Sequence, residues 1–203
     1  MWALVESNSI SKIYARPTAL QLGDIQYPAN IFELWTEAEL KAIGIYEITV
    51  DNTNLKDKEY YQNTDVTYTY NSSPDTVTGA YGTATAKSLT DVLYTATDES
   101  NGLGTEGELR TRGLKYRKKE TINGRANALL QKYDWYTLRA ASGGTAIPSS
   151  VSTYQAAVRT KANSMCTQID NAADVDALAA LYVYNDATPP VRPLGEFPDK
   201  PTL

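Results

Sequence analysis

Histidine is absent from this chain of 203 residues, and cysteine occurs only once, as Cys166. Without imidazole there are no Ser/His or Cys/His catalytic pairs and no metal sites built on histidine. One cysteine cannot form a disulfide within the chain or a thiolate metal cluster, so packing must hold the fold, which suits a reducing compartment. We therefore expect a protein that is not an enzyme and that has no catalytic residues, no cofactor and no metal ion.

Long hydrophobic runs are also lacking, because charged or turn-forming residues interrupt every apolar stretch well before about 18 residues. The first residues do not show the basic segment followed by an apolar stretch that marks a secretory signal. A net charge of −5 leaves room for one local basic patch but argues against a protein that coats nucleic acid. We expect a soluble protein made in the cytoplasm, with no membrane, nucleic-acid or small-molecule partner.

Residues 1–97 contain the signals of a β-rich module. Among the aromatic residues 15 are tyrosine, 3 are tryptophan and 2 are phenylalanine, and tyrosine suits half-buried strands and interfaces. Alternating β-favouring residues around polar turns predict two hairpins and one further strand, over residues 2–5 with 10–14, 64–70 with 76–85, and 45–50. Thr36 and Glu39 have capping-box spacing, so a short helix is predicted over 36–43.

Residues 98–107 are acidic and rich in glycine, a composition typical of a linker. Residues 108–185 are predicted to form a helical module, because apolar residues recur there at helical spacing. The predicted helices cover residues 109–133, 148–170 and 174–182. Residues 186–203 form a Pro-rich tail that must be extended, since proline lacks the N–H donor that helices and central strands require. The predicted fold class is α+β, with a small N-terminal β-rich module, a C-terminal helical module and this tail.

Basic residues cluster between 110 and 125, and four of them are candidate contact residues: Lys115, Arg117, Lys118 and Lys119. Lysine and arginine bind phosphate by charge, but no set of base-stacking aromatic residues accompanies them here. A solvated helix face is the simplest interpretation of this run. Contact with an acidic partner chain, or with the acidic linker, is the next interpretation, and we do not expect contact with DNA.

Aromatic residues supply the other candidate contacts. Trp135 follows the apolar stripe of the helix predicted over 109–133, and it is either a core anchor between two helices or a partner-binding hot spot. The core anchor is the more common of these two roles for tryptophan, and it is the one we expect for Trp135. In the second hairpin Tyr68 and Tyr70 alternate with threonine, and this hairpin and the Pro-rich tail offer unpaired backbone and aromatic area for docking against other chains.

Three segments of the C-terminal half resemble a known family. They read RANALLQKYDWYTLR over residues 125–139, AIPSSVSTYQAAVR over 146–159 and GEFPDKP over 195–201. Together they resemble the C-terminal module of tail fibre assembly proteins and tail assembly chaperones of tailed bacteriophages. The pattern of that module is Leu-Leu-x-x-x-Asp-Trp, then an aromatic-x-x-Ala-x-Arg helix, then Trp-Pro-x-x-Pro. Phe197 stands where the pattern has tryptophan, and we include it among the candidate contact residues.

The N-terminal part, from MWALVE through QYPANIFELWT to IGIYEI, is similar to tail-associated proteins of marine and cyanobacterial phages. The resemblance implies a non-enzymatic structural component of the virion, in the tail, baseplate or fibre-attachment region, made in the host cytoplasm. It implies other virion proteins as partners and an oligomer within a symmetric assembly. The alternative is a tail or fibre assembly chaperone that is absent from the finished particle. A hydrolase of the host envelope is a third hypothesis, but the sequence shows neither a nucleophile with its base nor a convincing acid pair.

Overall fold

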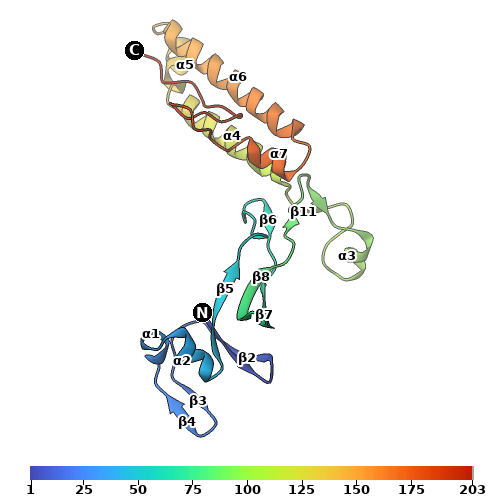
Figure 1. Ribbon diagram of the computed structural model, residues 1–203. Helices are drawn as coiled ribbons and strands as arrows, with labels where there is room; N and C mark the ends of the chain where they lie inside the picture. Colours follow the sequence, from blue (N-terminus) through green and yellow to red (C-terminus); the bar gives the residue numbers. More distant parts are fainter. Residues whose placement is uncertain (203) are drawn as a thin grey trace. The chain divides into compact units, whose positions relative to one another are not determined.

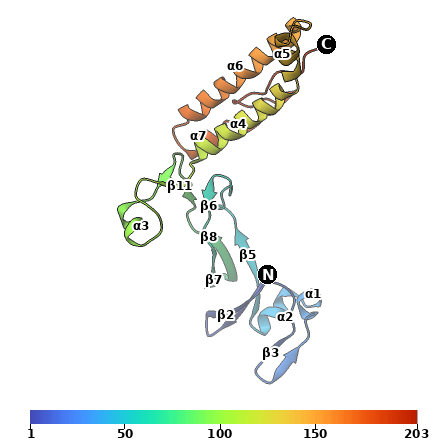
Figure 2. The same cartoon turned by 180° about the vertical axis from the view of Figure 1, so that it is seen from behind.

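The computed structural model describes residues 1–202, which form two compact units, residues 1–85 (unit 1) and 86–202 (unit 2). Unit 1 contains the main sheet, and unit 2 contains the long helices, as Figure 1 and Figure 2 show from opposite sides. This distribution confirms the predicted α+β class, with strands in the N-terminal part and helices in the C-terminal part. The two units divide at residues 85–86, whereas the sequence analysis placed the boundary at 97–98.

Unit 1 is built on a five-stranded sheet with the strand order β2, β1, β5, β8, β7. Neighbouring strands are antiparallel except for β5 and β8, which run parallel. The strands cover Trp2–Glu6 (β1), Ser9–Tyr14 (β2), Ile45–Asp51 (β5), Val66–Ser72 (β7) and Asp75–Tyr81 (β8). Both predicted hairpins and the predicted central strand are thus confirmed, with β8 ending before residue 85.

Both faces of the sheet of unit 1 carry buried residues, which alternate along the strands because successive side chains point to opposite sides. One face packs against two short helices, α1 (Ile31–Leu34) and α2 (Glu37–Ala42). The buried residues of that face are Leu4, Tyr14, Leu20, Ile31, Phe32, Leu40 and Ile45. The other face buries Ala3, Tyr46, Ile48 and Val77. The paired registers Ala3 with Tyr46 and Leu4 with Ile45 keep each set on its own face.

Short elements surround this sheet. The Thr36 N–H donates to the Glu39 carboxylate at 2.8 Å, and the Thr36 hydroxyl accepts from the Glu39 N–H at 3.3 Å. This capping box confirms the short helix predicted from the spacing of the two residues. The sequence predicts no element at the hairpin of β3 (Leu20–Leu22) and β4 (Ile25–Tyr27), at α1 or at the two-residue strand β6 (Tyr61–Gln62). The last residue of the strand arm predicted over 76–85 lies instead in a separate two-residue strand, β9 (Thr85–Ala86).

The segment predicted as a linker belongs to an ordered hairpin of unit 2. Strand β10 (Val92–Leu93) pairs antiparallel with β11 (Leu109–Thr111), and the chain between them includes α3 (Ala96–Ser100). Gly104 lies against the ring of Tyr94, so closely that a Cβ there would be 2.5 Å from a ring carbon. Glycine therefore serves close packing at this position, and its presence does not indicate a flexible connection.

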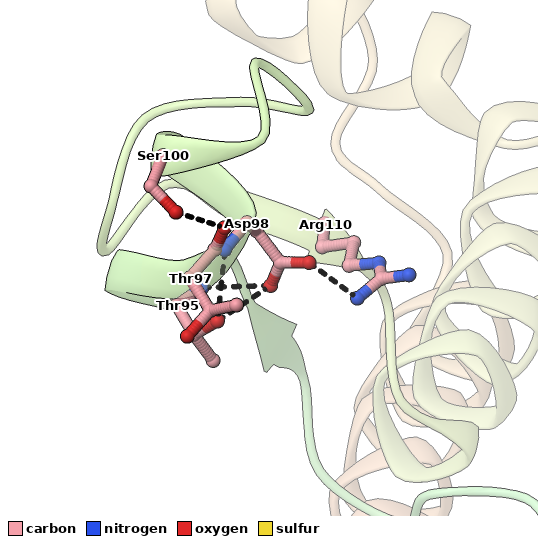
Figure 3. A network of polar contacts seen from close by, with 5 residues as sticks. All are labelled: Thr95, Thr97, Asp98, Ser100 and Arg110. Carbon is pink, nitrogen blue, oxygen red and sulfur yellow. Dashed lines mark hydrogen bonds and ion pairs between the residues drawn. The ribbon is translucent and has the colours of Figure 1, made fainter.

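Asp98 is the centre of the polar network drawn in Figure 3. Its carboxylate accepts hydrogen bonds from the Thr95 N–H at 2.9 Å and the Thr95 hydroxyl at 2.8 Å, and it lies 3.2 Å from the Arg110 guanidinium. The Thr95 hydroxyl accepts from the Asp98 N–H at 3.2 Å, which completes a second capping box. The Thr95 N–H and hydroxyl, with Arg110 adding, hold the pKa of Asp98 below its usual value. This spacing of Thr95 and Asp98 orders the acidic segment despite its glycine content.

The long helix α4 (Leu114–Gln131) begins on backbone groups of the preceding segment. The N–H groups of Leu114 and Lys115 donate to the carbonyls of Ser88 and Leu89 at 2.9 and 3.1 Å. The first turn of a helix leaves such N–H groups without an intrahelical partner, and these carbonyls satisfy two of them. Gly113, the residue before the helix, donates its N–H to the Asp91 carboxylate at 2.8 Å.

We predict opposite effects for two glycine-to-alanine changes at and within α4. Gly113→Ala should destabilise unit 2 by about 1–3 kcal/mol, because the new Cβ would lie 2.3 Å from the carbonyl carbon of Thr90 and 2.5 Å from the Leu89 oxygen. The control Gly124→Ala has nothing within 4 Å of the new methyl group, and it should stabilise the helix by about 1 kcal/mol. Urea denaturation followed by circular dichroism measures both, and an unchanged midpoint for Gly113→Ala would contradict the docking of α4 on this backbone.

Helices α4 and α6 (Ser149–Asn171) pack side by side in unit 2, as both ribbon views show. They are antiparallel, because Lys115 at the start of α4 bonds the Asp170 carbonyl at the end of α6, while Tyr133 beyond α4 meets Tyr154 early in α6. The core stripe of α6 is Val151, Tyr154, Val158, Ala162, Met165 and Ile169, as its spacing predicted. The predicted third helix is α7 (Val175–Ala180), with Asp174 as its N-cap. None of the helices among the described residues is long and apolar enough to cross a membrane.

The Pro-rich tail has no helix or strand between residues 186 and 202, but it folds back onto unit 2. Leu194 is fully buried, and its N–H donates to the Leu181 carbonyl at 3.0 Å. The Asn185 N–H donates to the Val191 carbonyl at 2.8 Å and closes a loop. The tail is therefore part of the helical unit, and its buried part does not offer free backbone for docking as the sequence analysis expected.

Candidate interaction surface

A group of aromatic, apolar and cationic side chains lies on and beside α5 (Asp134–Ala141), a helix that the sequence did not predict. We call it the α5 cluster; its members are Tyr133, Trp135, Tyr136, Leu138 and Arg139. Trp135 is 50% exposed and Leu138 is 68% exposed. Positions 135, 138 and 139 have the i, i+3, i+4 spacing that puts side chains on one helix face. This face presents an aromatic ring, an aliphatic side chain and a cation together.

Ring contacts hold the α5 cluster in one arrangement. The Trp135 and Tyr136 ring centroids are 3.9 Å apart, and the Arg139 guanidinium lies 4.7 Å from the Trp135 ring and 5.2 Å from the Tyr136 ring. Tyr133 lies 6.4 Å from Tyr136 in a stacked arrangement, and its ring meets Tyr154 of α6 edge-on at 5.3 Å. The exposed rings are thus tied to the core through Tyr133, so the surface is largely ordered before any partner binds.

Arg139 has unused hydrogen-bonding capacity. Its Nε is shielded from solvent and has no hydrogen-bond partner, and no carboxylate of residues 1–202 lies within ion-pair distance of its guanidinium. A guanidinium stacked on aromatic rings presents its remaining N–H groups in a fixed plane that matches a carboxylate. The α5 cluster is therefore suited to bind an acidic group that lies beside an apolar side chain.

The expectation that Trp135 packs between two helices is wrong. Tyr133 occupies that place, because it is 9% exposed and contacts Tyr154 of α6. The chain leaves helical geometry at Tyr133, which has φ −116° and ψ 2°, so α4 ends before it and a separate helix starts at Asp134. This break turns Trp135 toward solvent. The alternative that the sequence left open, a contact residue for a partner, fits its exposure.

Tyr68 and Tyr70, the candidate residues of the second hairpin, are half-buried parts of unit 1. Both pack against the core cluster that contains Tyr46 and Val77. The Tyr70 ring meets the Tyr46 ring at 5.3 Å, and its hydroxyl donates to the Asp75 carboxylate at 2.7 Å, which raises the pKa of Tyr70. The structure thus uses these rings to stabilise the sheet, where the sequence analysis expected a flat docking area.

The basic residues of α4 meet groups within unit 2. Lys115 donates to the Asp170 carbonyl at 2.9 Å, Lys119 pairs with the Asp170 carboxylate at 2.7 Å, and Lys118 lies 4.2 Å from the Tyr182 ring. Arg117 is exposed. Upstream in the same run, Arg110 pairs with Asp98, as the hypothesis of a contact with the acidic segment predicted. Most of this positive charge therefore has partners within the unit itself.

Phe197, the last candidate contact residue, is half-buried and helps to fix the tail on α4. The Arg125 guanidinium of α4 lies 5.5 Å from its ring. The neighbouring Glu196 pairs with Arg192 at 2.8 Å and with Arg125 at 3.8 Å. The Phe197 ring thus lies against a helical arginine within unit 2.

Comparison of this chain with family models, curated proteins and solved structures finds no match. Among residues 1–202 there is no group of three or more acidic or cysteine side chains arranged to hold a metal ion. Burial raises the pKa of the Cys166 thiol, which keeps it in the weakly reactive protonated form.

Sequence reasoning identified Trp135 but missed the residues that make it a surface. Leu138 and Arg139 share its helix face, and Tyr136 stacks against it. The i, i+3, i+4 spacing of Trp135, Leu138 and Arg139 was a usable signal, because none of the three continues the apolar stripe of α4. The unpaired state of Arg139 had no signal in the sequence, since it depends on which carboxylates the fold brings near.

Proposed function

We propose that this protein is a non-enzymatic structural component of a tailed-phage virion, placed in the tail, baseplate or fibre-attachment region. It acts through protein–protein contacts, and its partners are other virion proteins. The observation that carries the proposal is the α5 cluster, in which the exposed side chains of Trp135 and Leu138 share one ordered helix face with the partly buried Arg139. Tryptophan and arginine are the residue types that most often dominate binding energy in protein interfaces.

Two further points support this proposal. The segment that contains Trp135 is one of those that resemble tail fibre assembly proteins, so the exposed residues and the resemblance coincide in the chain. The basic residues of α4 that charge alone would assign to nucleic acid are engaged by Asp170 and Tyr182 instead. Contact with protein is therefore a better account of the exposed surface than contact with DNA.

Mass spectrometry of purified particles tests the proposal, using a phage whose genome encodes this chain. We expect the protein in particles at a fixed ratio to other tail proteins. A double variant, Trp135→Ala with Arg139→Ala, should fold but should be depleted from particles, because it removes the aromatic and cationic parts of the contact face. Val183→Ala, a change at a 64% exposed apolar residue of the same unit, is the matched control and should enter particles normally.

The opposite result favours the alternative that the protein is a tail or fibre assembly chaperone. Such a protein would be present in lysates of infected cells, bound to a tail or fibre protein, and absent from purified particles. If the protein is absent from particles and binds no tail protein in the lysate, both roles are rejected.

A further inference from the structure

Glu33 and Leu34 of unit 1 are exposed and without partners in the described part of the chain. Leu34 is 73% exposed, the highest value for a large hydrophobic side chain among the described residues. The Glu33 carboxylate is exposed and makes no hydrogen bond or ion pair with residues 1–202. By contrast, the Glu37 and Glu39 carboxylates of the next helix bond Lys41 and Thr36.

The helix that carries Glu33 and Leu34 is held firmly. Ile31 and Phe32, the first two residues of α1, are buried in the core of unit 1. The Phe32 ring lies 4.8 Å from the Trp2 ring and 5.8 Å from the Tyr14 ring. The acidic and aliphatic pair is therefore presented from a fixed backbone, which lowers the entropy that a partner must remove on binding.

This pair has the chemistry that the α5 cluster lacks. The α5 cluster offers Trp135 and Leu138 as apolar groups and Arg139 as a cation without a carboxylate. Glu33 supplies a carboxylate without a cation, and Leu34 supplies an apolar side chain without cover. Stacked guanidinium groups bind carboxylates with good geometry, and aliphatic side chains cover aromatic rings well.

We propose that the α5 cluster of one copy binds Glu33 and Leu34 of a second copy of this chain. This inference rests on the proposed function in taking the α5 cluster as a contact surface, and it adds the identity of one partner. The overall charges of the two units also agree with it. Unit 1 has 5 basic and 11 acidic residues, a net charge of −6, whereas unit 2 has 14 basic and 13 acidic residues, a net charge of +1. Net charges of opposite sign favour the encounter of unit 1 of one copy with unit 2 of another.

The proposed contact joins two different surfaces of the same chain, so it is heterologous. A single contact of this kind leaves one unused surface on each of the two copies, so further copies can add. Such contacts generate a ring when the rotation between copies closes, and an open chain of copies when it does not.

Sedimentation of the purified full chain tests the proposal. Over roughly 1 to 500 μM, a range in which interfaces of modest size associate, the average mass should rise above that of one chain. Leu34→Asp and Leu138→Asp each block one of the two surfaces, and each variant alone should associate about tenfold more weakly or worse. Both positions are exposed, so circular dichroism and melting should match the parent. Leu103→Asp, at a 57% exposed leucine outside both surfaces, is the matched control and should associate like the parent.

Mixing the two blocked variants gives the sharpest result. Leu34→Asp retains a working α5 cluster, and Leu138→Asp retains a working Glu33 surface. An equal mixture should therefore form pairs that contain one chain of each variant, and no larger assemblies.

The charge reversals Glu33→Arg and Arg139→Glu should each weaken association, and the double variant should restore it, because the ion pair is rebuilt with its charges exchanged.

Three results overturn this inference. They are a parent that stays monomeric throughout the range, a mixture that forms no pairs, and a Leu103→Asp variant that loses association as well. A monomeric parent that is nevertheless found in particles means that the α5 cluster binds another virion protein, and the proposed function survives. Association in solution together with absence from particles supports the self-contact and rejects the structural role.

Discussion

Tyr133→Ala is expected to lower the free energy of unfolding of unit 2 by about 3–5 kcal/mol, the usual cost of truncating a buried aromatic side chain. The ring is 9% exposed and contacts the rings of Tyr154 and Tyr136. Its loss leaves a cavity between the end of α4 and the start of α6. Urea denaturation of the full chain, followed by far-UV circular dichroism, measures this effect, because the long helices all belong to unit 2.

Trp135→Ala is the matched control, since the two aromatic residues are neighbours in the chain. Trp135 is 50% exposed, and its removal should cost about 1 kcal/mol or less, as is usual for surface changes. Depletion from particles and weaker self-association are the expected consequences of this change. Equal destabilisation by the two variants would show that Trp135 belongs to the core and would remove the basis of the α5 cluster.

Elements with a strong local signal could be predicted from the sequence. The capping box of Thr36 and Glu39, the tyrosine and threonine alternation of β7, and the apolar stripe of α6 all appear where their spacing placed them. Each signal depends on residues close together in the chain, and each agrees with the tertiary packing around it. The small hairpin of β3 and β4 has only three residues in each strand, too few for a periodic signal.

The linker predicted over residues 98–107 was wrong because it was inferred from composition and not from residue spacing. Residues 98–107 have the glycine and acid content of a linker, yet Thr95 and Asp98 cap a helix there, and Arg110 pairs with that aspartate. The glycine residues include one that packs against a ring, a role that composition cannot reveal. A search for Thr-x-x-Asp spacing would have found α3.

The α5 cluster could be predicted only in part, because the exposure of its side chains depends on the folded structure. Trp135 is visible as an unusual residue in the sequence, but its exposure depends on the helix break at Tyr133. A shift of one or two residues in the helical phase moves a side chain from the core to the surface, and no strong breaker marks this position. Glu33 and Leu34 likewise gave no signal, because their significance lies in the absence of partners in the folded unit.

Leu194 shows how a segment read from its prolines alone can be misjudged. Five of the nine prolines of the chain follow residue 186, and proline excludes helix and central strand there. Regular structure is indeed missing from the tail. The tail is nevertheless partly buried, because Leu194 has no exposed surface. Glu196 also pairs with arginine residues of the tail and of α4. The tail thus closes the core of unit 2.

Leu194→Ala should therefore lower the free energy of unfolding of unit 2 by about 2–5 kcal/mol, because it removes a fully buried leucine and leaves a cavity. The Leu194 N–H, which donates to the Leu181 carbonyl, should also exchange with solvent faster, since the tail loses its anchor. Val191→Ala, at a 53% exposed residue of the same tail, should change stability by about 0.5 kcal/mol or less. If both variants melt like the parent, the tail is not part of the core of unit 2 and is free to contact other chains, as its prolines alone suggest.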